Sequence, residues 1–103
     1  MKSKRSKATD ITMKTKQKVY DRDNGTCIIC GRPGMPNSHY IKRSKGGLGI
    51  EQNIVTMCIS CHNAYDNGYD NDRRDYIRTK TKEYLKRIYN NWNETDLIYD
   101  KWR

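Results

Sequence analysis

Four cysteines in two closely spaced pairs are the first residues of this chain that could do chemistry. Their spacing is C-x2-C-x27-C-x2-C, and two cysteines three apart around a tight turn can direct both sulfurs at one ion. The four residues are Cys27, Cys30, Cys58 and Cys61. Because four thiolates leave no open coordination position, the pattern predicts a structural Zn²⁺. Redox chemistry is the alternative, but it does not require two pairs with the same local spacing.

Two histidines accompany the cysteines. His39 lies between the two pairs and His62 directly follows Cys61. A histidine can be a packed core residue, a metal ligand or a proton-transfer group, and residue type alone leaves these roles open for His39. Asp66 follows His62 by four positions, so on a helix the imidazole and the carboxylate could approach one divalent ion together.

Short elements are predicted to position these groups. Residues 38–43 and 53–57 are rich in strand-forming types and are joined by a glycine-containing segment, which predicts a two-stranded hairpin with a broad loop. Asn53 is expected to begin the second strand. The second cysteine pair runs directly into a predicted helix over 58–66, which the sequence Asp-Asn-Gly then ends.

Two further helices are predicted to flank this unit. One runs from Thr12, a candidate N-cap, to about Arg22, and the other covers about 71–92. The second has an apolar stripe that should pack on the zinc module, formed by Ile77, Tyr84, Leu85, Ile88 and Trp92. Its basic flank is either a phosphate-binding surface or a solvated face. Residues 1–11 are expected to be a basic, mobile arm.

Composition limits what these elements can form. The chain has 103 residues, of which 34% are hydrophobic and 32% charged, and it contains no phenylalanine. One domain with a small core is expected, and such a core needs a further stabilising element such as a bound metal ion. The sequence therefore predicts a small zinc-stabilised α+β domain over 12–103, with its zinc-binding core at 25–68.

The formal net charge of +9 indicates a polyanionic partner, of which nucleic acid is the commonest in a cell. Charge that only aids solubility is the alternative. No apolar run approaches the roughly 20 residues of a membrane span, so no membrane partner and a cytoplasmic location are expected. In a reducing compartment, paired cysteines favour metal binding over disulfides.

The segment "SHYIKRSKGGLGIEQNIVTMCISCHNAYDNG", together with the upstream "CIIC", resembles the HNH endonuclease family. The resemblance is to the small bacteriophage type, which has a four-cysteine zinc site. It implies a ββα-metal core, in which a two-stranded hairpin and one helix hold a catalytic metal. It also implies metal-dependent hydrolysis of DNA phosphodiester bonds, with low sequence specificity and 5′-phosphate and 3′-hydroxyl products.

The resemblance assigns roles to four residues by position. His39 matches the general base of the family, and a neutral imidazole with a pKa near ~6.5 can accept a proton from water. Asn53 matches the middle residue of the motif, which in some members braces the hairpin loop and in others binds the metal. His62 matches the last residue, a metal ligand, and Asp66 stands where bacteriocin nucleases of the family have a second metal-binding histidine.

The chain departs from the family at Ser38, where most members place an acidic residue or a histidine that completes the catalytic metal site. A neutral hydroxyl is a poorer ligand, so weak metal binding or lost activity is implied. Mg²⁺ or Mn²⁺ is the first expectation for the metal, with Ni²⁺ or Zn²⁺ as alternatives. Arg43 and Lys45, on the loop after His39, are candidate phosphate contacts or solvated charges.

Two other functions compete with the nuclease. One is a catalytically silent zinc module that binds nucleic acid, which Ser38 favours. The other is an accessory of a phage DNA-packaging motor, in which a terminase protein would be the partner. DNA is the partner expected for the nuclease.

Overall fold

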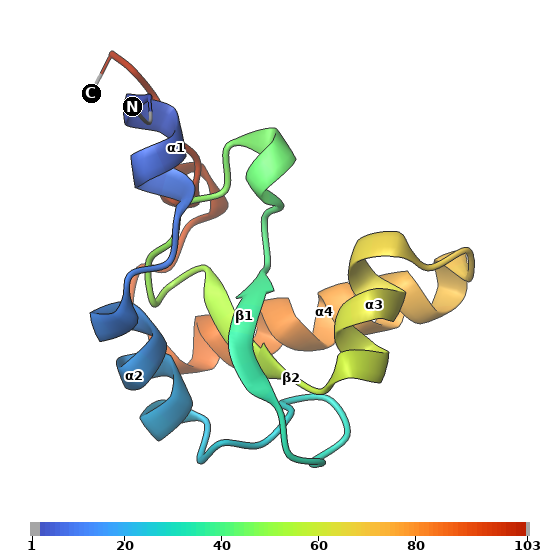
Figure 1. Cartoon of the computed structure of the whole chain (residues 1–103). Helices are drawn as coiled ribbons and strands as arrows, with labels where there is room; N and C mark the ends of the chain where they lie inside the picture. Colours follow the sequence, from blue (N-terminus) through green and yellow to red (C-terminus); the bar gives the residue numbers. More distant parts are fainter. Residues whose placement is uncertain (1–2, 103) are drawn as a thin grey trace.

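A computed structural model describes residues 3–102 of the chain. It contains six helical elements, two of them single 3-10 turns, and two strands (Figure 1). In chain order they are α1 (Lys4–Thr9), α2 (Met13–Arg22), β1 (Met35–His39), η1 (Arg43–Lys45), β2 (Ile54–Met57), α3 (Ile59–Asn67), α4 (Asn71–Ile88) and η2 (Glu94–Leu97). No helix in the described part of the chain is long and apolar enough to cross a membrane.

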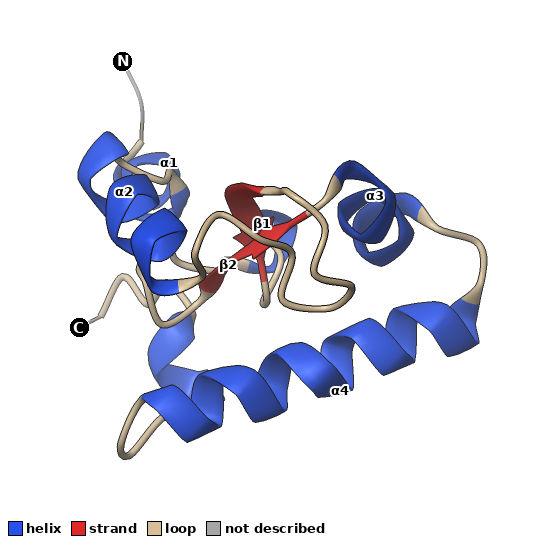
Figure 2. Cartoon of the chain, turned by 90° about the horizontal axis from the view of Figure 1, so that it is seen from below, coloured by secondary structure: helices blue, strands red, loops and turns tan. Residues whose placement is uncertain are grey.

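The two strands form an antiparallel hairpin at the centre of the molecule. Ser38 pairs with Val55 and His39 pairs with Ile54, with an irregularity between Met35 and Ser38. Seen from below, α1 and α2 lie on one side of the hairpin and α3 on the other, while α4 runs along the base of all of them (Figure 2). The predicted α+β fold, with a hairpin, flanking helices and four clustered cysteines, is confirmed.

Strand β1 begins and ends earlier than predicted, at Met35–His39 instead of 38–43. The shift has a physical cause in Asn53. The carbonyl of Asn53 accepts a hydrogen bond from Tyr40 N, and its side-chain amide then binds both the N–H and the carbonyl of Ile41. Because a side chain replaces the next strand partner, the ladder ends at His39 and the chain turns away.

The N-terminal segment also differs from the prediction. Instead of a mobile arm, residues 4–9 form helix α1, capped by Ser3, and Thr9 is buried. The segment is attached to the hairpin loop through Gly49 N, which donates to Ala8 O at 2.9 Å, and through Arg5, which donates to Ser44 O at 3.1 Å. Residues 1 and 2 of the expected arm lie outside the described residues.

Helix α2 and its Thr12 cap match the prediction, but α4 ends at Ile88 rather than near residue 92. The predicted stripe is therefore split. Ile77 and Leu85 are buried, Ile88 is exposed, and Trp92 lies beyond the helix, where its ring packs on Tyr40 with a centroid distance of 5.6 Å. A periodic pattern cannot distinguish a helical residue from one that reaches the same core after a turn.

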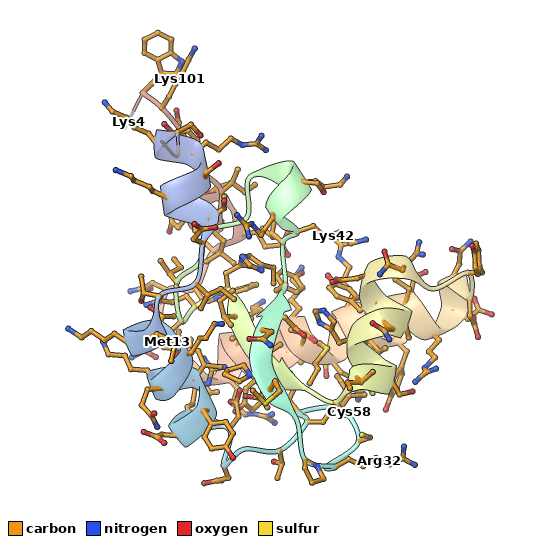
Figure 3. The ribbon with its side chains drawn as sticks, in the orientation of Figure 1. Lys4, Met13, Arg32, Lys42, Cys58 and Lys101 are labelled. Atoms are coloured by element: carbon orange, nitrogen blue, oxygen red, sulfur yellow. The ribbon has the colours of Figure 1, made fainter. Side chains whose placement is uncertain are left out.

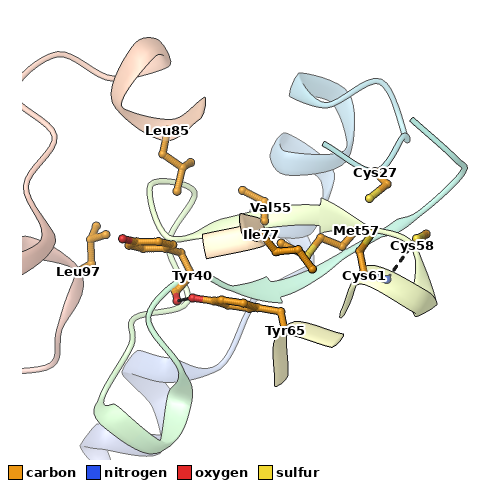
Figure 4. Packing of buried hydrophobic residues seen from close by; sticks show 10 residues of the cluster. All are labelled: Cys27, Tyr40, Val55, Met57, Cys58, Cys61, Tyr65, Ile77, Leu85 and Leu97. Carbon is orange, nitrogen blue, oxygen red and sulfur yellow. Dashed lines mark hydrogen bonds between the residues drawn. The ribbon is translucent and has the colours of Figure 1, made fainter. Parts of the chain in front are cut away.

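The core joins the hairpin, α3 and α4 and extends to the cysteines (Figure 4). Its members are Cys27, Tyr40, Val55, Met57, Cys58, Cys61, Tyr65, Ile77, Leu85 and Leu97. Three of the four cysteines are thus buried within the apolar cluster, so the metal site and the core form one unit.

The broad loop of the hairpin depends on its glycine pair. Gly46 has φ +84°, a left-handed conformation that most residues avoid. At Gly47, a Cβ atom would lie 1.6 Å from Ile41 O, so the backbone could not pass with a side chain there. The C-terminal segment closes the loop from outside, since Leu48 N donates to Leu97 O and Tyr99 N donates to Gly46 O.

Candidate active site and metal centre

The four cysteines come from two turns that meet at one end of the hairpin. Cys27 and Cys30 lie on the turn before β1, whereas Cys58 caps the N-terminus of α3 and Cys61 lies in its first turn. All four sulfur atoms lie within 4.8 Å of one another, and those of Cys30 and Cys58 are 3.5 Å apart. A tetrahedral Zn²⁺ with bonds of about 2.3 Å needs sulfurs roughly 3.8 Å apart. The cluster is therefore compatible with a structural zinc.

The environment of Cys58 favours a thiolate. Burial alone would raise its pKa, but the backbone N–H of Cys61 and the neighbouring thiols donate hydrogen bonds that lower it to about 7. A thiolate is the form in which cysteine binds zinc.

A cleft of about 580 Å³ lies between the N-terminal segment, β1 and α3. His39, His62, Asp66 and Arg43 line it together, and Lys16 of α2 joins them. Asn53 and Lys45 do not line this cleft. Four of the predicted site residues therefore meet at one surface.

His39 is held by the N-terminal segment. Its Nε2 atom lies 2.8 Å from the backbone carbonyl of Thr9, and the residue is 9% exposed. Because a carbonyl only accepts hydrogen bonds, Nε2 carries the proton and Nδ1 is left with a free lone pair. Burial lowers the pKa of His39 below its usual value, and this effect outweighs the opposing hydrogen bond to Thr9. The imidazole is thus neutral at physiological pH.

His62 contacts a side chain at each ring nitrogen. Nδ1 lies 2.6 Å from Ser38 Oγ, and Nε2 lies 3.2 Å from Asp66 Oδ2. Two adjacent ligands on one divalent cation, each at about 2.1 Å, are separated by roughly 3 Å. His62 and Asp66 therefore fit a cation held between them. Ser38 is buried behind His62 and its hydroxyl contacts the imidazole.

Asn53 is fully buried and does not line the cleft. Its Oδ1 accepts from Ile41 N at 2.8 Å, while Nδ2 donates to the carbonyls of Ile41 and Leu48 at 3.1 and 2.8 Å. The amide is occupied by the backbone of the loop that follows His39. Of the two roles implied for Asn53, this geometry corresponds to bracing.

The two candidate phosphate contacts face different surfaces. Arg43 lines the cleft, where its guanidinium forms an ion pair with Asp10 of the N-terminal segment. Lys45 lies on the other side of the same loop, in a smaller pocket against α4.

Sequence reasoning missed several contributors to the cleft, among them Thr9, Asp10 and Lys16. Thr9 contributes a backbone carbonyl, which every residue type has, so no residue pattern could have indicated it. Asp10 is the one acidic residue among seven basic ones in the first 18 positions, and that isolated charge was the only available signal.

The family comparison agrees with this geometry. A protein-family model described as HNH endonuclease matches residues 27–68. A protein named Anaredoxin from Nostoc sp. is 32% identical over 57 residues, covering 53% of this chain and 75% of that protein. The chain belongs to the HNH endonuclease family. No solved structure gives a significant match.

HNH membership indicates a nuclease or nucleic-acid-binding function, and domains of this family generally bind DNA. The matched residues contain both cysteine pairs, the hairpin and α3. The Thr9 carbonyl and α4 lie outside the matched residues.

Proposed function

We propose that this HNH protein is a metal-dependent DNA endonuclease with His39 as the general base. The observation that carries the proposal is the shared cleft, in which an imidazole with a free Nδ1 lies beside a His-Asp pair spaced for one divalent cation. The substrate is DNA with little sequence preference, because the cleft presents cations for phosphates and few groups to read bases.

In the proposed reaction, Nδ1 of His39 removes a proton from a water molecule that attacks the scissile phosphorus. The Thr9 carbonyl fixes the orientation of the ring and stabilises the imidazolium that forms. His62 and Asp66 would hold a divalent cation, with Mg²⁺ or Mn²⁺ favoured over Ni²⁺ or Zn²⁺, and that cation would supply positive charge for the phosphate and the departing 3′-oxygen. Lys16 and Arg43 add cationic side chains to the same cleft.

Ser38 takes part in this site as a positioning residue. When Nδ1 of His62 donates its proton to Ser38 Oγ, Nε2 keeps a lone pair for the cation. The residue that breaks the family pattern thus orients a ligand instead of serving as one.

A catalytically silent module that binds nucleic acid is the second candidate, and Ser38 is the observation that favours it. Without an acidic side chain at this position, the cleft offers the cation two protein ligands, His62 and Asp66. Phage DNA packaging is one setting for either function, and a terminase-dependent enzyme would nick poorly alone and efficiently once that partner is added.

The decisive experiment is plasmid nicking by the purified protein and by His39→Ala. Each protein is treated with a chelator that spares the cysteine site, and Mg²⁺ or Mn²⁺ is then restored. Metal-dependent conversion of supercoiled to nicked DNA by the native protein, with loss in the variant and one zinc retained in both, is expected. If neither protein nicks DNA, with or without a packaging partner, while both bind it equally, the silent module is correct.

The pH profile of nicking gives a second prediction. The base acts only when His39 is neutral, so the single-turnover rate should fall as pH decreases through the pKa of His39. Because burial lowers this pKa, the acid limb should lie below the usual value of 6.5. Single-turnover nicking between pH 4.5 and 8 at saturating metal measures it. An acid limb above pH 6.5 would contradict the assignment of a buried, neutral base.

Ser38→Ala should weaken binding of the catalytic cation by about 10- to 100-fold, the usual cost of losing a group that orients a metal ligand. The Mn²⁺ concentration needed for half-maximal nicking measures this effect. Ser44→Ala is a matched control, because Ser44 lines the same cleft and contributes only its backbone carbonyl to a recorded hydrogen bond. Equal Mn²⁺ dependence in native protein and Ser38→Ala would show that the hydroxyl does not position His62.

A further inference from the structure

A second pocket, of about 240 Å³, lies between the segment that follows β1 and helix α4. Tyr40 and Tyr65 are among the residues that line it. Four cationic residues and one acidic residue also line it, namely Lys42, Lys45, Arg74, Arg78 and Asp75. The pocket therefore carries an excess of three positive charges in a space smaller than a drug-sized ligand site.

These four cations differ from their neighbours in forming no salt bridge, although Glu94 is close enough to Arg78 to interact with it electrostatically. Nearby, Lys82 pairs with Glu94, Lys80 with Glu83 and Arg43 with Asp10. Within residues 3–102, no salt bridge involves Lys42, Lys45, Arg74 or Arg78. Gathering like charges around a hollow costs free energy unless an anion offsets it.

Arg74 is the best-fixed cation of the four. One terminal nitrogen donates to the carbonyl of Gly68, and the other lies 3.5 Å from Asn71 Oδ1. Its Nε atom is buried and has no hydrogen-bond partner. These contacts hold the guanidinium in place at the pocket, and a guanidinium is a group suited to binding an oxyanion.

The polar atoms of the two tyrosines are already occupied. Tyr40 donates its hydroxyl to Glu94 at 3.0 Å, and the Tyr65 hydroxyl donates to the carbonyl of Tyr40 (Figure 4). Because both hydroxyls are engaged, the cations provide the polar contacts for a ligand in the pocket. This arrangement suits a compact anion such as a phosphate group.

Lys42 connects this pocket to the catalytic cleft, because it lines both. Its ammonium group lies 3.4 Å from the carbonyl of Asp66 and 5.8 Å from the centroid of the Tyr65 ring. In Figure 3, Lys42 extends into the space between the η1 turn and α3. A polyanion that crosses Lys42 can therefore contact both sites.

We propose that the pocket binds a non-scissile phosphate of the DNA backbone and extends the substrate contact from the cleft to helix α4. The identity of the polyanion as DNA rests on the function proposed above. The inference also gives Lys45 a role. This residue lines the second pocket and not the cleft, so it would contact DNA through the pocket.

The test compares DNA binding by charge variants in the His39→Ala background, in which cleavage cannot interfere. Arg74→Gln/Arg78→Gln removes two cations of the pocket. Lys86→Gln/Arg87→Gln removes two exposed cations from the last turn of the same helix and is the matched control. The Kd for a duplex of about 20 base pairs is measured by fluorescence anisotropy at several salt concentrations.

The pocket variant should bind about 10-fold more weakly, with a salt dependence reduced by about one ion, as expected for one lost phosphate contact. The control should change much less. Because Arg74 also bonds Gly68, Lys45→Gln is measured as well, since the Lys45 side chain is exposed and can be changed without loss of folding. Lys45→Gln should also weaken DNA binding, as Arg74→Gln/Arg78→Gln does.

Equal affinities for the pocket variants and the control would overturn the inference, even if the native protein nicks DNA. If the protein never nicks DNA but its DNA binding still depends on the pocket, the inference about the pocket is supported and the proposed nuclease function is wrong. Inorganic phosphate is titrated as a separate ligand. Pocket-dependent binding of phosphate, combined with DNA binding that ignores the pocket, would also overturn the inference, because it would indicate a site for a free anion.

Discussion

Deletion of residues 1–11 should lower the single-turnover rate of nicking by roughly 10²- to 10⁴-fold while the zinc content stays at one ion per chain. The range is that of losing an oriented general base. Thr9 supplies the carbonyl that keeps the proton of His39 on Nε2 and the lone pair on Nδ1. Without it, the ring can rotate and exchange tautomers in the cleft.

The deletion also removes basic residues, so a point variant with unchanged charge is needed beside it. Gly49→Ala provides one, because a Cβ atom there would lie 2.0 Å from Asp10 O and 2.5 Å from Asp10 C. The N-terminal segment must then move away from the loop, and nicking should fall in the same direction. Lys7→Ala is the control, since Lys7 is exposed on α1 and its side chain makes no recorded contact.

The protonation of the two imidazole nitrogens of His39 can be measured directly, and it shows whether a change of tautomer causes the loss of rate. In nitrogen-15 spectra, His39 of the native protein should show a protonated Nε2, and Gly49→Ala should show a mixture of tautomers. A native rate in both the deletion and Gly49→Ala would show that the N-terminal segment is not part of the active site.

The sequence predicted the parts of this site that depend on residue type and local spacing. Two CxxC pairs and a His-Asp pair four residues apart on a helix each specify local geometry. The position of His39 was not specified in this way, because the predicted strand over 38–43 puts it near the start and β1 ends at it. Helix α3 begins at Ile59 with Cys58 as its cap, close to the predicted start, because the second cysteine pair and the helix share one turn.

The parts that could not be predicted depend on contacts between distant segments. The Thr9 carbonyl reaches His39 across 30 residues, and Trp92 reaches Tyr40 after α4 has ended. The side of the loop to which Lys45 points depends on the turn at η1 and on the approach of α4. Backbone groups and loop directions of this kind have no residue-type signature.

Ser38 shows how a departure from a family pattern gains meaning from structure. In the sequence it is only the absence of an expected ligand. In the structure its hydroxyl lies against the Nδ1 atom of His62. Under the proposed function, this change of residue type replaces a ligand by a group that orients another ligand, and we expect it to alter the binding strength for the cation.

Removal of the structural zinc should unfold the protein. Three of the four cysteines are part of the hydrophobic core, and zinc sites of this kind contribute about 10–16 kcal/mol of apparent binding free energy. Typical domains are stable by only about 5–15 kcal/mol. A strong chelator under reducing conditions should therefore abolish the near-UV circular dichroism signal, and Cys61→Ser should give the same result at normal zinc concentrations.

Loss of this zinc should also disassemble the cleft. His62 directly follows Cys61, and the Cys58 thiolate caps the helix that carries His62 and Asp66. A weak chelator that removes only the catalytic cation should leave the fold intact, and Mg²⁺ should then restore nicking. Restoration after the strong chelator should require zinc as well as Mg²⁺. Zinc-free protein with a native spectrum and an unchanged melting temperature would contradict the structural role of the four cysteines.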